Sequence, residues 1–151
     1  MTHAASITAS FESRLEAVEQ CEAMVRRFAS ECGFDEDDVY FLGLAAREIV
    51  INAIRHGNRF DPAKRVDVNL RWSEGKLIIE VSDSGEGFHL EDVPDPRSPE
   101  NHGKRSGRGL AMTRGIMDEV SVGENTPGGT RVRMVKALPL TLQPEAGHAR
   151  S

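Results

Sequence analysis

The 151-residue sequence contains few aromatic side chains, since Phe, Trp and Tyr together make up only 5% of it. Aliphatic residues must therefore supply most of any hydrophobic core. A composition that is 38% hydrophobic and 28% charged is typical of a globular chain rather than a disordered one. The length fits one domain of ordinary size, with room for a core between two layers.

The sequence also lacks a surplus of positive charge, because 19 Lys and Arg face 24 Asp and Glu, for a net charge of -5. Proteins that bind nucleic acid nonspecifically neutralise phosphates with Lys and Arg gathered on one face. The charge balance therefore argues against direct binding of nucleic acid. It leaves open the binding of one phosphorylated small molecule.

Long apolar runs are absent, and no stretch approaches the ~20 residues needed to cross a bilayer. The N-terminal stretch MTHAASITAS has neither the charged start nor the apolar core of a signal peptide. We therefore expect no membrane contact and a cytoplasmic location. The two cysteines, Cys21 and Cys32, form neither a metal-ligand spacing nor a disulfide framework, and we expect both to be reduced thiols.

Hydrophobic periodicity predicts an α+β domain. Two stretches have a helical period and a glycine where the helix would end, and two alternating stretches separated by SEG indicate a β-hairpin. A further helix and two strands follow a long loop. The predicted elements are helices at Glu12–Glu31, Asp37–His56 and Leu110–Val120, and strands at 66–72, 76–83, 120–125 and 128–138.

This order of elements favours a two-layer sandwich with helices on one face of the sheet. We expect residues 1–10 to be a flexible N-terminus or a short edge strand, 11–137 to be the domain, and 138–151 to be a flexible tail. Between the hairpin and the third helix, Gly, Pro, Ser and charged residues replace apolar ones for roughly 25 positions. A loop of that length inside a compact domain is usually functional or mobile.

The stretch REIVINAIRHGN places a carboxylate and an amide, Glu48 and Asn52, one helical turn apart among aliphatic residues. The helical wheel puts Phe41, Ala45, Ile49, Asn52 and His56 on one arc, with Glu48 at its edge. Burying an unpaired amide costs about 1 to 3 kcal/mol, and burying an unpaired carboxylate costs more. Either a local hydrogen bond or an exposed helix edge satisfies these groups, or this edge of the helix lines a site.

Two glycine clusters favour the site. DSGEGF follows a strand directly, and Gly85 and Gly87 let the backbone approach a ligand closely, while Asp83 supplies an acceptor at the strand end. KRSGRGL opens a helix, whose first-turn amides lack partners within the helix and attract an anion. Each cluster alone is a common turn or cap, but their order after an ExxxN helix is unlikely to arise by accident.

The series ExxxNAxxHG, DSGEGF, SGRGL, MDEV and GGT resembles the ATPase fold shared by gyrase, histidine kinases and MutL, the GHKL superfamily. Within it the resemblance is to the anti-sigma-factor serine/threonine kinases of the RsbW and SpoIIAB type, over about residues 10 to 137. The resemblance implies the Bergerat, or histidine-kinase-like, ATPase fold, with a mixed but mainly antiparallel sheet. It also implies ATP and Mg²⁺ as cofactors.

The resemblance implies roles for individual residues. Asn52 would coordinate Mg²⁺, Glu48 would orient or deprotonate the attacking hydroxyl, and Asp83 would accept from the adenine amino group. Further residues would complete the nucleotide site: Gly85, Gly87 and Thr130 at the adenine, the amides of Gly107, Arg108, Gly109 and Leu110 at the phosphates, and Arg105 near the terminal phosphate.

The implied activity is phosphorylation of a small STAS-domain antagonist protein on Ser or Thr, with possible sequestration of a sigma factor in a bacterial partner-switching pathway. A homodimer is expected. The alternative is a catalytically weak module whose ATP and ADP states alter its grip on a partner, although a pure binder needs no base at Glu48. The catalytic half of a histidine kinase fits poorly, because residues 11–31 contain no phosphoacceptor His.

Overall fold

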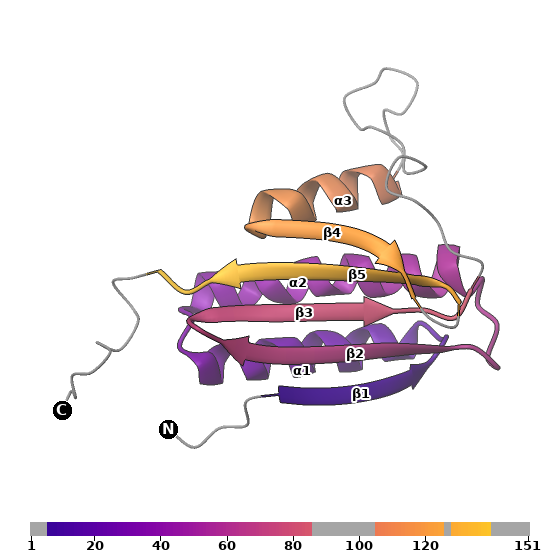
Figure 1. The fold of residues 1–151 in the computed structure, drawn as a ribbon, viewed down its shortest axis with the longest axis horizontal. Coiled ribbons are helices and arrows are strands. Elements are labelled where there is room, and N and C mark those ends of the chain that lie inside the picture. Colours follow the sequence, from indigo (N-terminus) through magenta and orange to yellow (C-terminus); the bar gives the residue numbers. More distant parts are fainter. Residues whose placement is uncertain (1–5, 86–104, 126–127, 140–151) are drawn as a thin grey trace.

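The computed structural model describes residues 6–85, 105–125 and 128–139. These residues form two layers: a five-stranded sheet, and a layer of helices that packs on one face of it (Figure 1). The strand order is β1-β2-β3-β5-β4, so β1 and β4 are the two edges. All four pairings are antiparallel, and no parallel pair of the expected mixed sheet occurs among the described strands.

The predicted hairpin is confirmed. Strands β2 (Arg65–Ser73) and β3 (Lys76–Ser82) are joined by a two-residue turn at Glu74 and Gly75, both with positive φ, as the twist of a tight hairpin requires. The other strands are β1 (Ser6–Glu12), β4 (Glu119–Glu124) and β5 (Thr130–Ala137).

The helical layer begins with α1 (Glu16–Cys32), which ends where Gly33 adopts a left-handed φ of 108°. The next helix, α2 (Glu36–Asn52), is capped by Asp35, whose Oδ1 accepts from the Asp38 amide at 2.9 Å. The π-helix η1 (Ala53–Gly57) continues α2, and α3 (Arg105–Ile116) packs beside α2.

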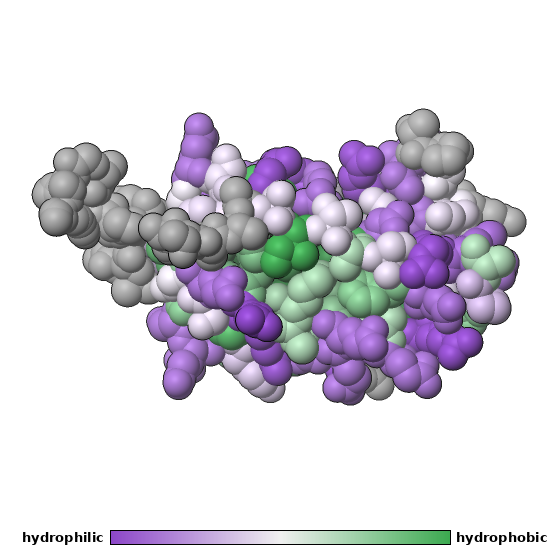
Figure 2. Space-filling model, turned by 90° about the horizontal axis from the view of Figure 1, so that it is seen from below, coloured by the Kyte–Doolittle hydropathy of each residue, from purple (hydrophilic) through white to green (hydrophobic). Residues whose placement is uncertain are grey.

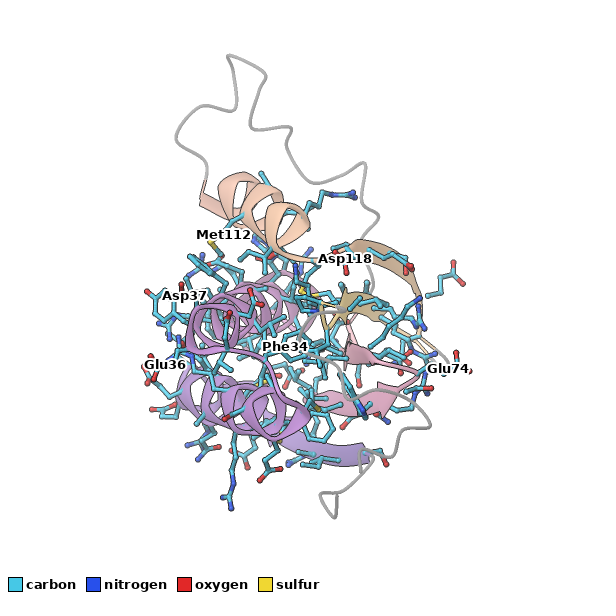
Figure 3. All side chains as sticks on the ribbon, turned by 90° about the vertical axis from the view of Figure 1, so that its left-hand side faces the viewer. Phe34, Glu36, Asp37, Glu74, Met112 and Asp118 are labelled. Carbon is cyan, nitrogen blue, oxygen red and sulfur yellow. The ribbon has the colours of Figure 1, made fainter. Side chains whose placement is uncertain are left out.

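The core lies between the two layers. Buried Val, Leu and Ile of β2 and β3 face Val25, Phe28, Leu42 and Val50 of the helices. Figure 3 shows Phe34 between the helices and the sheet, where its ring meets Trp72 edge to face at 6.1 Å. Among the described residues, no helix is long and apolar enough to span a bilayer.

Two predicted helix boundaries are wrong. The first helix was expected to begin at Glu12, but Ser6–Glu12 is a strand whose every residue pairs with β2, and the helix starts at Glu16. The local pattern around Phe11 is compatible with a helix and with a strand. Pairing with the otherwise free edge of β2 stabilises the strand. The third helix ends at Ile116, since Glu119 and Val120 pair with β5. Cys21 and Cys32 are free and buried, as expected.

Candidate nucleotide site

The C-terminal half of α2, which packs beside α3, carries Glu48 and Asn52. Asn52 is 7% exposed, and its side chain makes no hydrogen bond to any residue that the structure describes. Glu48 is half-buried and lies against Gly109 of α3, where a Cβ would overlap the Glu48 carboxylate. Among the described residues, neither group therefore has a hydrogen-bond partner that would explain its position structurally.

The wheel prediction for α2 is correct in its middle and wrong at its ends. Ala45, Ile49 and Asn52 are buried, as expected. Phe41 is 46% exposed, and His56 is exposed because the helix changes its period before reaching it. A π-helix closes its hydrogen bonds five residues apart, which turns the following side chains away from the α-helical arc.

The change of period comes directly after Asn52. The Asn58 amide donates to the Ala53 carbonyl at 2.8 Å, an i to i−5 bond that closes η1. Burial, followed by the charges of Arg55 and Arg59, lowers the pKa of His56, so its imidazole is predominantly neutral at pH 7. The π-helix carries Gly57 to the turn that follows β3. Short π-helical segments inside longer helices are frequent at functional sites.

The turn after β3 holds a buried carboxylate, Asp83, which is 2% exposed. Its Oδ1 accepts from the amides of Gly85 at 3.0 Å and Thr130 at 3.1 Å. Its backbone amide donates to the Thr130 carbonyl at 2.9 Å, and its backbone carbonyl accepts from Asn125 Nδ2 at 3.0 Å. Burial raises the pKa of Asp83, and the amides of Gly85 and Thr130 and the charge of Lys64 oppose that rise.

Glycines from three separate motifs enclose Asp83. A Cβ at Gly57 would overlap the Asp83 carboxylate, a Cβ at Gly85 would overlap the Gly57 carbonyl, and a Cβ at Gly129 would overlap the Asp83 carbonyl. Gly129 also has a φ of 100°, which disfavours any side chain. NAxxHG, DSG and GGT therefore meet at one carboxylate, and the close approach of their backbones requires the glycines.

The SGRGL motif forms the start of α3. Because α3 begins at Arg105, its first turn holds Arg105, Gly107 and Arg108, and amides there lack partners within the helix. Gly109 and Leu110 lie in the second turn, where a regular α-helix bonds each amide to a carbonyl four residues earlier. The Thr113 hydroxyl donates to the Gly109 carbonyl at 3.0 Å.

The structure thus brings most of the predicted site residues together around two elements, α2 with α3 and the Asp83 turn. Thr130 is buried beside Asp83, as expected for a shared pocket. Gly87 lies outside the described residues, as do the side chains of Arg105 and Arg108.

Sequence reasoning missed Asn58, which it treated only as part of a helix stop. Asn58 is 1% exposed and bonds through its side chain to Ser13, Arg65 and Ser84. Its partners lie 45, 7 and 26 residues away in the chain, so no local spacing signals them. The only available signal was an Asn directly after the HG of NAxxHG.

Metal ligands are sparse here. Among the described residues, no three His, Cys, Asp or Glu side chains gather as a metal site. The Asn52 amide oxygen is a suitable hard ligand, buried and without a partner in the described part of the chain. Mg²⁺ commonly takes one or two protein ligands and completes its octahedron with phosphates and water. The residues present therefore fit a nucleotide-bound Mg²⁺ and not an ion held by the protein alone.

Comparison with known proteins agrees with this geometry. Residues 11–136 match the family model of the histidine kinase-like ATPase domain. A serine-protein kinase RsbW of Bacillus licheniformis is 34% identical over 116 residues, which are 73% of this chain and 71% of that protein. An anti-sigma F factor of Clostridium botulinum is 33% identical over 106 residues, which are 66% of this chain and 71% of that one.

A solved structure shows the same fold. The crystal structure of the RsbU and RsbW domains of a Mycobacterium tuberculosis protein superposes with a TM-score of 0.63 at 19% identity. The match covers 88% of this chain and 32% of that one. The chain belongs to the histidine kinase-like ATPase family, of the type that includes RsbW and the anti-sigma F factors, and has the Bergerat fold of that family.

Proposed function

We propose that the protein is an ATP-dependent serine/threonine kinase that phosphorylates a small STAS-domain antagonist and also binds a sigma factor, in a bacterial partner-switching pathway. The observation that carries this proposal is the buried Asp83 carboxylate enclosed by glycines of three motifs, with Asn52 and Glu48 on the adjoining helix and without a hydrogen-bond partner among the described residues. The names of the relatives, a serine-protein kinase and an anti-sigma F factor, support the same activity and partners.

The adenine end of the site is the Asp83 turn. Asp83 accepts a hydrogen bond from the exocyclic amino group of adenine. Its carboxylate suits this role because two backbone amides hold it in place and it is buried before any ligand arrives. Gly85, Gly87 and Thr130 bound the same pocket. A fixed acceptor of this kind selects an amino group over a carbonyl at the same position of a purine.

The phosphate end is the junction of α2 with α3. Asn52 would supply an amide oxygen to a nucleotide-bound Mg²⁺, and that ion would stabilise the charge on the transferred phosphoryl group. Glu48 accepts the proton of the attacking hydroxyl or orients it. The first-turn amides of α3, at Gly107 and Arg108, hold phosphate oxygens together with the Arg105 side chain. The amides of Gly109 and Leu110 join them if the first turns of α3 unwind.

A homodimer through the β1 edge completes the proposal. The edge strand β1 contains neither Lys nor Pro, the residues that usually protect an exposed edge. Beside it lies a groove of about 480 Å³, where Ile7 of β1 and Ala23, Met24 and Phe28 of α1 form an apolar floor and Gln20, Arg27 and Glu31 of α1 also line it. Figure 2 shows apolar surface at the centre of this face and hydrophilic surface around it. A second copy is the simplest occupant, because an edge strand pairs with its own copy by two-fold symmetry.

The kinase proposal predicts separable effects at the two polar residues of α2. Glu48→Gln is expected to bind Mg-ATP normally and to lower phosphate transfer to the antagonist about 100- to 10,000-fold, as the loss of a general base does. Asn52→Ala is expected to lose Mg-dependent nucleotide affinity. Transfer of label from ATP to Ser or Thr of the cognate antagonist measures phosphate transfer, and titration with Mg-ATP measures nucleotide affinity. The exposed Glu119→Gln variant is the matched control for both measurements.

Wild-type protein that binds Mg-ATP but labels no verified antagonist would contradict the kinase proposal and favour the nucleotide-gated binding module. Phosphate found on His would favour a histidine kinase acting on a separate protein.

Asp83→Asn is expected to weaken ADP binding about 10- to 100-fold, because a hydrogen bond to a charged group contributes about 1.5 to 3 kcal/mol. The same variant is expected to unfold at a higher temperature than wild type at pH 7 without nucleotide. Because the folded-state pKa of Asp83 is raised, ionising this carboxyl costs stability as the pH rises through that pKa. Calorimetric scans from pH 4 to 8 are expected to show the difference shrinking toward low pH; an advantage that grows on acidification contradicts the assignment.

Gly57→Ala is expected to lower stability by about 1 to 3 kcal/mol and to weaken ADP binding, because its Cβ displaces the Asp83 carboxylate. Gly115→Ala in α3 is the matched control, since a Cβ there meets nothing within 4 Å and a helical Gly→Ala change stabilises by up to about 1 kcal/mol. Chemical denaturation and ADP titration measure both. Unchanged ADP affinity in a folded Gly57→Ala variant would show that the enclosed carboxylate is not the nucleotide contact.

Met24→Glu is expected to convert a wild-type dimer into a monomer of 16.6 kDa, because it places a charge among the apolar residues Ile7, Ala23 and Phe28 of the groove beside β1. Sedimentation equilibrium measures the mass. Ser121→Glu on the opposite edge strand is the control and is expected to remain dimeric. A monomeric wild type, or a dimeric Met24→Glu, would place the interface elsewhere or remove it.

A further inference from the structure

Asn58 connects three parts of the chain that surround the Asp83 turn. Its Nδ2 donates to the Ser13 hydroxyl at 2.8 Å and to the Arg65 carbonyl at 3.0 Å, and its Oδ1 accepts from the Ser84 amide at 2.9 Å. Both amide protons and the oxygen therefore have partners. The Arg65 carbonyl only accepts and the Ser84 amide only donates, so the orientation of the Asn58 amide follows from its partners.

The contact with Ser84 is the one that matters for the nucleotide site. Ser84 has an exposed side chain and lies between Asp83 and Gly85, in a turn with no sheet partner on the β2 side. From the β5 side, the Thr130 backbone and the Asn125 side chain hold Asp83. From the β2 side, the Asn58 Oδ1 accepts from the backbone amide of Ser84, the residue after Asp83. The Asp83 turn is thus fixed from both sides.

The other two contacts fix Asn58 itself. Ser13 is 2% exposed, and its hydroxyl donates in turn to the Lys64 carbonyl at 2.5 Å. The backbone amide of Asn58 closes the π-helix on Ala53. Asn58 therefore cannot rotate away without leaving several buried polar groups unpaired, each at a substantial cost. Its oxygen is a rigid acceptor aimed at the turn.

We infer that Asn58 is a positioning residue for adenine recognition: by holding the Ser84 amide, it sets the direction of the Asp83 carboxylate toward the exocyclic amino group of the base. This inference rests on the proposed nucleotide site. It adds a specificity determinant that contacts the recognition turn and not the nucleotide. Loss of Asn58 then lowers affinity for adenine more than affinity for a purine that lacks the amino group.

The test compares ADP with inosine diphosphate, which carries a carbonyl where adenine carries the amino group. Wild type is expected to prefer ADP. Asn58→Ala is expected to weaken ADP binding about 10-fold and to change inosine diphosphate binding less than about 2-fold, so that the preference shrinks. Ser13→Ala removes a buried partner of Asn58 without touching the Ser84 contact, and it is expected to lower the melting temperature while keeping the preference.

Equal losses of both nucleotides in Asn58→Ala, or an unchanged preference, would overturn the inference while leaving the proposed function standing. A wild type that binds neither nucleotide, or prefers neither, would remove the proposed function itself and this inference with it.

Hydrogen exchange of the wild type provides a test that needs no folded variant. The Ser84 amide is expected to be protected without nucleotide although it lies in an exposed turn, because the Asn58 oxygen accepts from it. Exchange at the rate of an unstructured amide would overturn the inference even if Asn58→Ala does not fold. Protection of the Ser84 amide supports the inference. If Asn58→Ala does not fold, Asn58→Ser replaces it in the comparison of ADP with inosine diphosphate.

Discussion

The site depends on a carboxylate, Asp83, that the fold keeps 2% exposed in the space between β3 and β5. Burying this charge is unfavourable, and the raised pKa of Asp83 reflects that cost. The amides of Gly85 and Thr130 offset part of it. A third hydrogen-bond donor, from a ligand, would offset more, so the protein without nucleotide holds a buried acceptor whose position is already fixed. This is the condition under which one hydrogen bond discriminates strongly between ligands.

The glycines around Asp83 allow the backbone of three separate segments to pack closely about its carboxylate. The π-helix after Asn52 moves Gly57 into contact with it, and Gly85 and Gly129 close the remaining sides. The same helix carries Asn52 and Glu48 one and two turns earlier, with Glu48 against Gly109 of α3. The proposed adenine contact at Asp83, which packs against Gly57, and the proposed phosphate contacts at Glu48 and Asn52 are therefore connected through one continuous helical segment, α2 followed by η1.

Much of this fold was predictable from local patterns, and the failures have physical causes. The β2–β3 hairpin followed from two alternating stretches separated by SEG, and Asp83, Gly85 and Asn52 were singled out from short spacings. A short edge strand was one of two expectations for residues 1–10, and only its last residue, Glu12, was assigned to the helix, because pairing with β2 is a contact between distant segments. The π-helix has no periodic signature, so the predicted arc failed at His56. Asn58 was missed because its partners are remote in sequence.

The central claim is that an adenine nucleotide with Mg²⁺ joins the Asp83 turn to α2. Titrating ¹⁵N-labelled wild-type protein with ADP, first in EDTA and then in excess Mg²⁺, tests it most directly. The account predicts saturable shifts of the Gly85 and Thr130 amides, and a shift of the Asn52 side-chain amide that appears only with Mg²⁺. Saturable binding that leaves Gly85 and Thr130 unmoved, or no binding by folded protein, would contradict it.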